Sequence, residues 1–273
     1  MPEAVVRIVP LVSARRNLDI QPFTFRLFVY MIIVNADDWG RSKRETNISY
    51  ECYRLAKITS VTAMVFMEDS KRAAEIATER RIPTGLHLNF SEPFSDGQGN
   101  STLTSHHQRI MKFLRCGRLT QLFYNPLLAK AFEYVFRAQV DEFTRLYGKA
   151  PTHFDGHQHM HLCGNMLVAC LIPRGEKVRR SFSFGAGEKG FVNRGYRSLV
   201  NRRLAAHYRL TDYFFALSQH RSFERFARIC RLATDASVEL MTHPVVAAEE
   251  AFIMSNEYEQ NLQGISKISY VEL

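Results

Sequence analysis

Short apolar segments alternate with amphipathic ones from Met31 to the C-terminus. The first, MIIVNAD at 31–37, is a continuous apolar run that ends in polar residues, which is typical of a strand buried on both faces. Six further strands are predicted, at 60–66, 84–90, 151–157, 177–184, 212–217 and 238–242. Strands separated by helices indicate parallel β/α units. Seven such strands favour an α/β barrel, with an open sheet as the alternative.

Three segments have the pattern of amphipathic helices. SKRE at 42–45 matches the capping box and predicts a helix start. A second helix is expected over 69–80, and a long one over 127–147, where a glycine and then a proline follow. Residues 91–125 are rich in Gly, Asn, Ser and Thr, so we predict a loop-like insertion over the site.

The first thirty residues have little periodicity, and we interpret 1–30 as an N-terminal extension to a domain at 31–273. Charged residues interrupt any apolar run long enough for a signal peptide. The uncharged stretch 27–36 is much shorter than the roughly 20 residues of a membrane span. Translation starting at Met31 is an alternative to a functional extension. We expect a soluble, cytoplasmic protein without a membrane span.

Cysteine usage and charge narrow the function classes. The five cysteines are scattered with no C-x-x-C pair, which argues against a disulfide scaffold or a thiolate zinc site. The net charge is +9, and ten Lys/Arg against two Glu fall between Pro173 and Arg209. Such a cluster fits an anionic substrate, nucleic acid or a solvated helix face. It lacks the aromatic pattern of single-strand binding, so we expect no nucleic-acid partner.

Acids and histidines fall at the ends of four predicted strands: NADDWG at 35–40, GLHLN at 85–89, the histidine-rich 153–161, and MTHP at 241–244. Because the carboxyl ends of parallel strands meet at one edge, we expect these side chains to form one site. Carboxylates and imidazoles at such an edge are typical of a metal hydrolase.

Four histidines lie within 153–161, at alternate positions from 157 onward. The two-residue period of a strand puts His153, Asp155 and His157 on one face. Imidazole is the commonest neutral metal ligand, and a neighbouring carboxylate can fix its tautomer. The pattern does not choose among the four. His106 and His107, in the predicted insertion, are expected to be solvated.

Asp37 and Asp38 repel each other unless a cation or a proton separates their roles. One as a metal ligand and the other as a general base is a familiar division. The alternative, a helix-capping turn, is weakened because Ser42 already supplies a cap. His243 precedes a proline, which favours extended backbone at the strand end, from where it could donate a proton to a departing group.

The motifs NADDWG, GLHLNF, THFDGHQHMHL and ELMTHP, in this order and spacing, resemble the YdjC-like (ChbG/HpnK) carbohydrate deacetylases. The resemblance covers roughly residues 31–273. It implies a distorted seven-stranded TIM-like (β/α) barrel that hydrolyses N-acetyl groups on amino sugars with the help of a divalent cation. Homodimers occur in the family, so a homodimer is expected.

Carried over motif by motif, the resemblance implies Asp38, His87 and His157 as metal ligands, Asp37 as the general base and His243 as the acid. Magnesium is the expected cation, and the ligand set also suits zinc, manganese or cobalt. After His161 the chain departs from common members and enters the arginine-rich stretch. This leaves the acetylated sugar open, including one that carries an anionic or lipid-linked group.

Two other functions compete with this interpretation. The first is another barrel metal hydrolase, an amidohydrolase or phosphoesterase, in which Arg179 and Arg180 would hold an anionic substrate. The second is a basic, metal-stabilised binding module for RNA or anionic lipid headgroups. It would explain the arginines but leave the paired aspartates without a role.

Overall fold

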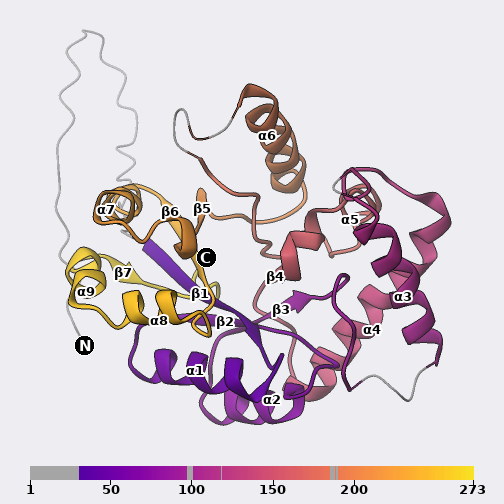
Figure 1. The fold of residues 1–273 in the computed structure, drawn as a ribbon, viewed down its shortest axis with the longest axis horizontal. Helices are drawn as coiled ribbons and strands as arrows, with labels where there is room; N and C mark the ends of the chain where they lie inside the picture. The colour runs from indigo at the N-terminus through magenta and orange to yellow at the C-terminus, as the bar shows by residue number, and fades with distance from the viewer. Residues whose placement is uncertain (1–30, 97–100, 118, 185–187, 189) are drawn as a thin grey trace, which may run out of the picture.

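The computed structural model describes residues 31–96, 101–117, 119–184, 188 and 190–273 (Figure 1). The predicted extension at 1–30 lies outside this range. The strands are β1 (Met31–Trp39), β2 (Ser60–Ala63), β3 (Thr84–Leu88), β4 (Phe154–Gly156), β5 (Tyr213–Ala216), β6 (Ser237–Thr242) and β7 (Ser266–Lys267). The α-helices are α1 (Lys43–Arg54), α2 (Ser70–Glu79), α3 (Ser101–Arg115), α4 (Ala129–Tyr147), α5 (Gly164–Ala169), α6 (Phe191–Ala205), α7 (Phe223–Leu232), α8 (Ala247–Ile253) and α9 (Asn256–Leu262).

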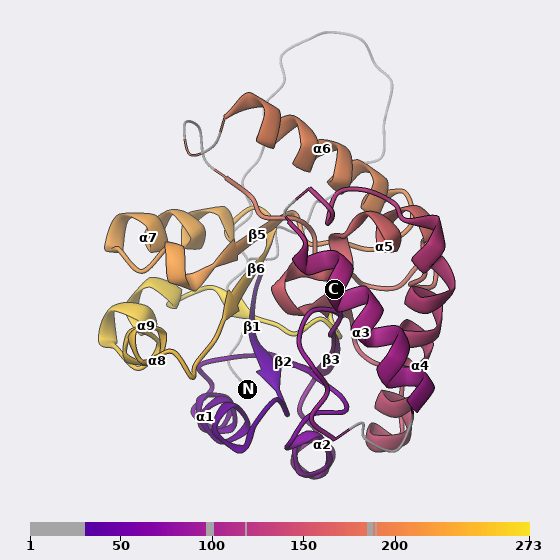
Figure 2. The same cartoon turned by 45° about the vertical axis from the view of Figure 1, so that its right-hand side comes forward.

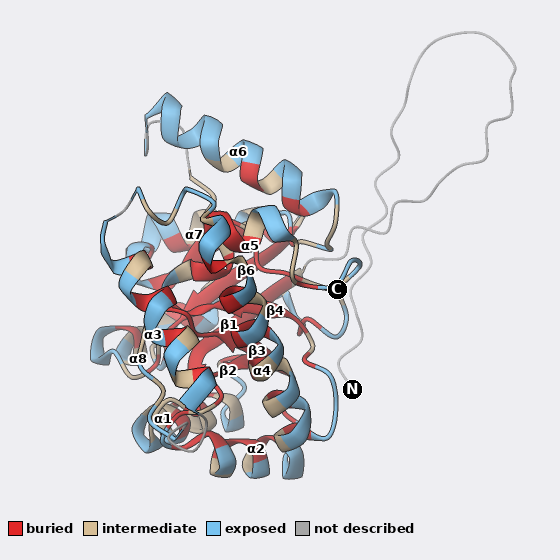
Figure 3. Ribbon diagram, turned by 90° about the vertical axis from the view of Figure 1, so that its right-hand side faces the viewer, coloured by how far each residue is buried: buried red, intermediate tan, exposed pale blue. Residues whose placement is uncertain are grey.

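The strands form one curled parallel sheet in the order β4-β3-β2-β1-β6-β5, and β7 pairs with the start of β1. Helices surround the sheet, so the strands lie in the buried centre of the molecule (Figures 1 and 3). The parallel β/α organisation expected from the sequence is confirmed. All strand pairs run parallel in the described part of the chain, so their carboxyl ends share one edge.

β1 is buried on both faces, as its apolar run predicts. Ile32 and Val34 pack into the main hydrophobic core, and burying a side chain of this size stabilises the fold by roughly 1.5–3 kcal/mol. Asn35 and Asp37 alternate with them and therefore face the other side. There the Ser60 hydroxyl donates to Asn35 Oδ1 at 2.7 Å. The concave side of the sheet thus carries a polar layer that leads towards the carboxyl edge.

The segment 177–184 is not the regular strand that the sequence predicts. It makes isolated bridges only, between Phe154 and Val178 and between Lys177 and Arg209. Its start bonds to β4 and its end to β5, where Ser183 N donates to Phe214 O at 2.9 Å. Because the segment crosses from one strand to the other, it cannot follow either for a continuous ladder. The sheet is therefore a curled half-barrel rather than a closed seven-stranded ladder.

The prediction of a loop-like insertion over 91–125 is wrong, because the 15-residue helix α3 lies in the middle of it. Leu103, His107, Ile110 and Leu114 are buried at helical spacing and pack against α4. The polar residues between them and the glycines before them concealed this period. His107 is accordingly not solvated. Its Nε2 lies 3.1 Å from Asn89 O, and its ring stacks on Phe94 at 3.9 Å between centroids.

The other predicted helices are confirmed with small shifts at their ends. At α1, the Ser42 hydroxyl caps the helix: it accepts from Arg44 N at 3.1 Å and donates to the Glu45 carboxylate. α4 ends at Gly148, whose φ of 65° lies in the left-handed region. In the described ranges no helix combines the length and the apolar character needed to cross a membrane. α6 lies at one end of the molecule and is mostly exposed (Figures 2 and 3).

Candidate active site

The carboxyl end of β1 contains a bulge that directs two neighbouring carboxylates to one site. The pairing with β2 shifts between Ala36 and Trp39, so β1 has one extra residue there. Asp38 takes up the irregularity with a φ of 64°, in the left-handed region. In a regular strand adjacent side chains point to opposite faces. The bulge instead allows both Asp37 and Asp38 to reach the histidines of the neighbouring strands.

Asp38, His87 and His157 come together as a buried group whose ligand atoms all lie within 4.8 Å of one another. Asp38 Oδ1 is 3.3 Å from His87 Nε2 and 3.0 Å from His157 Nδ1. One carboxylate and two imidazoles are a common donor set for a divalent transition metal or magnesium. These are the three ligands that the sequence resemblance implies, brought from β1, β3 and the end of β4.

The turn after β4 separates the four clustered histidines. Gln158 and His159 both have positive φ, which breaks the strand period directly after His157. His159 therefore packs its ring edge-on against Phe182, at 4.5 Å between centroids, and His161 Nε2 lies 3.0 Å from Arg179 O. Both are taken up by packing and backbone contacts rather than by the metal group.

His153 is also outside the metal group. Its ring stacks on Tyr270 at 3.6 Å between centroids, and it is fully buried. Burial and the nearby Arg179 hold the pKa of His153 well below its usual range. A neutral His153 is consistent with a core position. Of the four histidines, only His157 lies with Asp38.

Each imidazole of the metal group is fixed by a carboxylate on its other nitrogen. Asp155 Oδ1 lies 2.8 Å from His87 Nδ1, and Glu92 Oε2 lies 3.0 Å from His157 Nε2. Such partners orient a metal-ligating imidazole and set its tautomer. Glu92 also accepts from Arg41 Nε and Nη2, both at 3.1 Å. Arg41 and Glu92 are partly exposed and border the group on its solvent side.

Arg179 organises the carboxylates behind the metal group. It is fully buried, and two of its nitrogens donate to the two oxygens of Asp37, each at 2.7 Å. It also pairs with Asp155 at 2.6 Å and donates to Glu239 at 2.8 Å. A planar guanidinium suits this role because it can bind several carboxylates in fixed directions. Arg179 is thus occupied in the interior and is not available to an anionic substrate, contrary to the phosphate-holding role considered from the sequence.

The electrostatics of the site follow from burial and these pairs. Burial opposes ionisation of Asp38 and Asp37, but their hydrogen-bonded and charged partners outweigh this effect and keep both carboxylates ionised. Hydrogen bonds from His157 and His87 lower the pKa of Asp38, and the Arg179 charge lowers the pKa of Asp37. Burial alone would lower the pKa of His87, yet the charges of Asp155 and Asp37 raise it to about 10. The site therefore holds ionised carboxylates, and a cation that replaces the His87 proton would be stabilised by them.

A second group of possible ligands, Asp37, His87 and Asp155, shares His87 with the first. Both of its carboxylates already bind the Arg179 guanidinium at 2.6–2.7 Å. A cation placed there would lie against this guanidinium, and the two like charges would repel. The group around Asp38 also has a guanidinium nearby, but Arg41 Nη1 lies farther away, at 3.5 Å from Asp38 Oδ2, and Arg41 is partly exposed, so this group is the better metal site.

His243 follows β6 and is half-buried. Its backbone N donates to Glu249 Oε2 at 2.8 Å, which fixes the turn before the proline. The imidazole is near enough to Asp37 that its charge contributes to the low pKa of that carboxyl. The five residues selected from the sequence therefore gather at one edge of the sheet.

Sequence reasoning missed the supporting residues. Glu92 and Arg41 lie in turns with no periodic pattern, and Glu239 is an acid within an otherwise apolar strand. An acid at a buried strand position needs a partner in the interior, and this was the sequence signal that could have identified Glu239. Burial raises its pKa to about 7 although Arg179 and Tyr270 oppose this.

The matches to known proteins cover the part of the chain that contains the four motifs. Residues 31–271 match the family model of the YdjC-like proteins. A carbohydrate deacetylase of Danio rerio is 34% identical over 133 residues, which are 48% of this chain and 42% of that protein. A chitooligosaccharide deacetylase of Yersinia pestis is 31% identical over 137 residues, 48% of this chain and 51% of that protein. The chain thus spans about half the length of the curated relatives it matches.

The solved structures add a likeness in fold. An Enterococcus faecalis protein with a suggested role in cellobiose-phosphate cleavage has a TM-score of 0.59 and 16% identity. The superposition covers 89% of this chain and 98% of that one. At this identity the likeness concerns the fold alone.

Proposed function

Because this chain belongs to the YdjC-like protein family, we propose that it removes N-acetyl groups from an amino sugar or oligosaccharide. The names of the relatives supply the reaction class. The observation that carries the proposal is the placement of Asp37 directly beside the Asp38–His87–His157 group, at the carboxyl edge of the sheet. A base beside a Lewis-acid site is the minimum arrangement for hydrolysing an acetamide.

Asp38, His87 and His157 would hold the divalent cation. The donor set fits, since both imidazoles have their second nitrogen fixed by a carboxylate and the group is open towards Arg41 and Glu92. A bound cation would polarise the acetamide carbonyl and lower the pKa of a water molecule. We propose magnesium, with zinc, manganese or cobalt as alternatives.

Asp37 is the proposed general base. Arg179 holds it in one orientation, and the Oδ2 atom accepts from Arg179 alone among the described residues, so it keeps a lone pair for a proton. Its low pKa keeps the carboxylate ionised throughout the working range. A base with a low pKa takes up a proton less readily, so acidification of the water has to contribute much of the rate.

His243 is the proposed acid. Its imidazole makes no hydrogen bond to a described residue, and it faces the region of Asp37, where a leaving amine would lie. Proton transfer to the nitrogen as the C–N bond breaks releases acetate and a free amino sugar. His243 and Asp37 would then act on the two ends of one reaction, the attack and the departure.

We also propose that 31–273 form one deacetylase domain, a distorted TIM-like barrel in which the segment 177–184 takes the place of a strand. In such a barrel the site lies at the carboxyl ends of the strands, where the four motifs converge. The segment leaves the ladder at the point where the buried Arg179 turns inward.

The experiment is acetate release from a panel of N-acetylated sugars. The enzyme is stripped of metal and resupplied with Mg, Mn, Co or Zn. We expect metal-restored acetate release that is lost in His157→Ala and retained in His159→Ala, because His159 lies outside the metal group. Hydrolysis of phosphate esters without any acetate release would replace the deacetylase with the competing hydrolase.

A further inference from the structure

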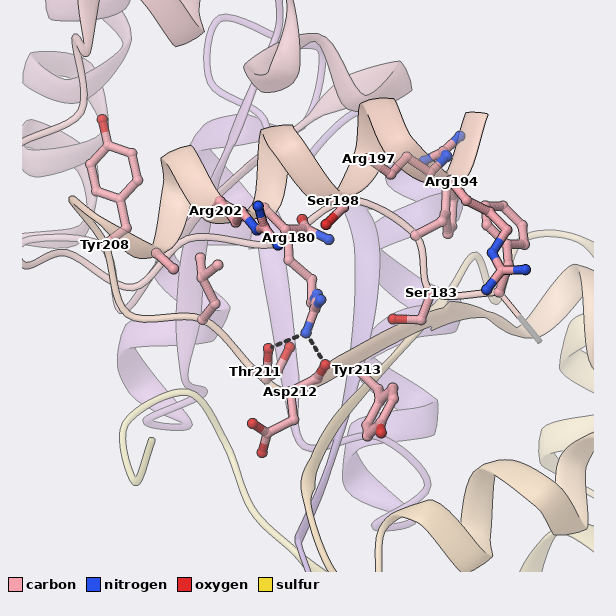
Figure 4. A pocket seen from close by; sticks show the side chains of 15 residues that line it. Arg180, Ser183, Arg194, Arg197, Ser198, Arg202, Tyr208, Thr211, Asp212 and Tyr213 are labelled. Atoms are coloured by element: carbon pink, nitrogen blue, oxygen red, sulfur yellow. Dashed lines mark hydrogen bonds between the residues drawn. The ribbon is translucent and has the colours of Figure 1, made fainter. Parts of the chain in front are cut away.

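A cavity of about 590 Å³ lies outside the metal group, between α6 and the segment 180–184 with the start of β5 (Figure 4). Four arginines line it: Arg180, Arg194, Arg197 and Arg202. Two of them, Arg194 and Arg202, are exposed, and the other two are half-buried. A cavity of this volume accommodates a sugar-sized molecule.

Within the described part of the chain, the four arginines of this cavity share its wall with only one carboxylate. Other arginines, such as Arg41, Arg72 and Arg145, pair with carboxylates. None of the four cavity arginines forms an ion pair with a described residue. The one carboxylate in the wall belongs to Asp212, and it accepts from Ser237 N and Oγ at 2.9 and 2.8 Å.

Arg180 is half-buried and has one unpaired nitrogen. Its Nη1 donates to the backbone carbonyls of Thr211, at 3.1 Å, and Asp212 (Figure 4). Its Nε is buried and has no hydrogen-bond partner among the described residues. Burial lowers the pKa of this guanidinium. The charge of Asp212 partly offsets this burial, but Asp212 forms no ion pair with Arg180, so an anion in the cavity would stabilise the guanidinium further.

Arg197 is held ready by aromatic rings. Its guanidinium lies over the ring of Phe184, at 4.9 Å from the centroid, and over Phe182 at 5.7 Å. Stacking fixes the plane of the guanidinium, and Nε donates to Asn193 Oδ1 at 2.8 Å. Nη1 and Nη2 have no hydrogen-bond partner among the described residues, so they can donate to a ligand. A planar donor edge matches the oxygens of a phosphate group better than a point charge would.

The cavity is separate from the proposed catalytic site but shares a wall with it. Arg179 and Arg180 are consecutive, but Arg179 pairs with Asp37 and Asp155, whereas Arg180 donates to the carbonyls of Thr211 and Asp212. Phe182 stacks on Phe214 at 4.7 Å, and Phe214 lies against the Arg179 guanidinium at 4.9 Å. A ligand in the cavity therefore contacts the outer side of the segment whose inner side orients Asp37.

We propose that this cavity binds the phosphate group of a small molecule, at a site distinct from the metal group. The four arginines supply the charge, and Phe184 and Tyr213 supply apolar walls for an attached sugar-sized body. The site does not depend on the proposed deacetylation, because binding is measured without turnover.

The test is calorimetric titration at low ionic strength with inorganic phosphate, glucose 6-phosphate and glucose. Glucose 6-phosphate has no acetyl group and so is no substrate for deacetylation. The variant is Arg194→Gln/Arg197→Gln, and the matched control is Arg221→Gln/Lys149→Gln, which removes the same charge at exposed positions outside the cavity. Circular dichroism checks that both variants are folded. If the double variant does not fold, Arg194→Gln alone, at an exposed position, replaces it in the titration.

We expect both phosphate compounds to bind the unmodified protein and glucose not to bind. Each lost arginine should weaken binding by about ten-fold, which corresponds to about 1.4 kcal/mol. Tighter binding of glucose 6-phosphate than of phosphate would assign the site to a phosphorylated sugar, and equal binding to phosphate itself. No binding of either compound, or an equal loss in the control variant, would overturn the proposal.

Discussion

Asp155→Asn tests whether the carboxylate behind His87 tunes the metal site. Asp155 is fully buried, with Oδ1 at 2.8 Å from His87 Nδ1 and Oδ2 at 2.6 Å from Arg179. Asparagine has the same shape but no charge, and its amide nitrogen would face a donor of Arg179 or of His87. Loss of an orienting partner of this kind lowers metal affinity by about 10–100-fold, or about 1.4–2.7 kcal/mol.

Competition between the cation and a proton for His87 changes the size of this loss of metal affinity with pH. In the metal-free protein burial favours neutral His87, but Asp155 and Asp37 raise its pKa to about 10. Below that pH a proton must leave before the cation binds, which costs up to about ten-fold in affinity per pH unit. Asp155→Asn lowers the pKa of His87 and so reduces this cost. The affinity gap between the two proteins should therefore be widest near pH 8.5 and should narrow towards pH 6.5.

The assay is a titration with chelator-buffered Mn or Co at pH 8.5, 7.5 and 6.5, after circular dichroism has shown a folded variant. Glu239→Gln is the matched control, because it also removes a buried carboxylate from Arg179 but does not touch His87. Its affinity should stay within about two-fold of the unmodified protein. A folded Asp155→Asn protein whose loss of affinity, relative to the unmodified protein, grows as the pH falls from 8.5 to 6.5 would refute this reasoning.

Three further changes test other parts of the site and the fold. Asp37→Asn should leave metal affinity nearly unchanged but lower turnover by about 10²–10⁴-fold, because it removes the proposed base and not a ligand. A metal titration measures the affinity and acetate release measures the turnover. A fully active variant would exclude the role of Asp37 as the base. Glu92→Gln should weaken metal binding by less than about ten-fold, because this partner of His157 is partly exposed; a loss as large as that of His157→Ala would make Glu92 a ligand itself. His107→Gln should remove part of the acid sensitivity of folding: burial lowers the pKa of His107 to about 4, so the unfolded chain takes up a proton first and stability falls between about pH 6.5 and 4. Urea unfolding at pH 7 and 4.5 should show a smaller drop in the variant, by up to about 3 kcal/mol, and an equal drop in both proteins would contradict this origin.

The parts of the site that the sequence predicts are those with a strand period and a chemical signature. β1, β3 and β6 have apolar runs that end in Asp or His, and the parallel arrangement brings such ends together. Among the clustered histidines, by contrast, the pattern alone could not choose. The choice depends on the positive φ of Gln158 and His159, and nothing in their side chains predicts this turn.

The other discrepancies have two causes, a local side-chain turn and a long-range packing contact. Glu92 reaches His157 because Asn89 Oδ1 accepts from Ser91 N and Glu92 N and so shapes the turn between them. The helix at Ser101–Arg115 is stabilised by packing on α4, which a polar composition conceals. The turn depends on hydrogen bonds of the Asn89 side chain to its own neighbours. At the helix local propensity is weak, and a partner distant in the sequence decides the structure.

The irregular backbone of the segment 177–184 is explained by the contacts of Arg179 and Arg180. A regular strand here could pair with β4 along its whole length, but Arg179 must reach Asp37, Asp155 and Glu239 on three different strands. Leaving these three carboxylates without it would place uncompensated charges in the core, which costs far more than a few ladder hydrogen bonds. The segment therefore gives up regular pairing so that Arg179 points inward. Arg180, one residue on, then points to the other side of the sheet, so the bond that orients the proposed base and the wall of the arginine-lined cavity are parts of the same short stretch of backbone.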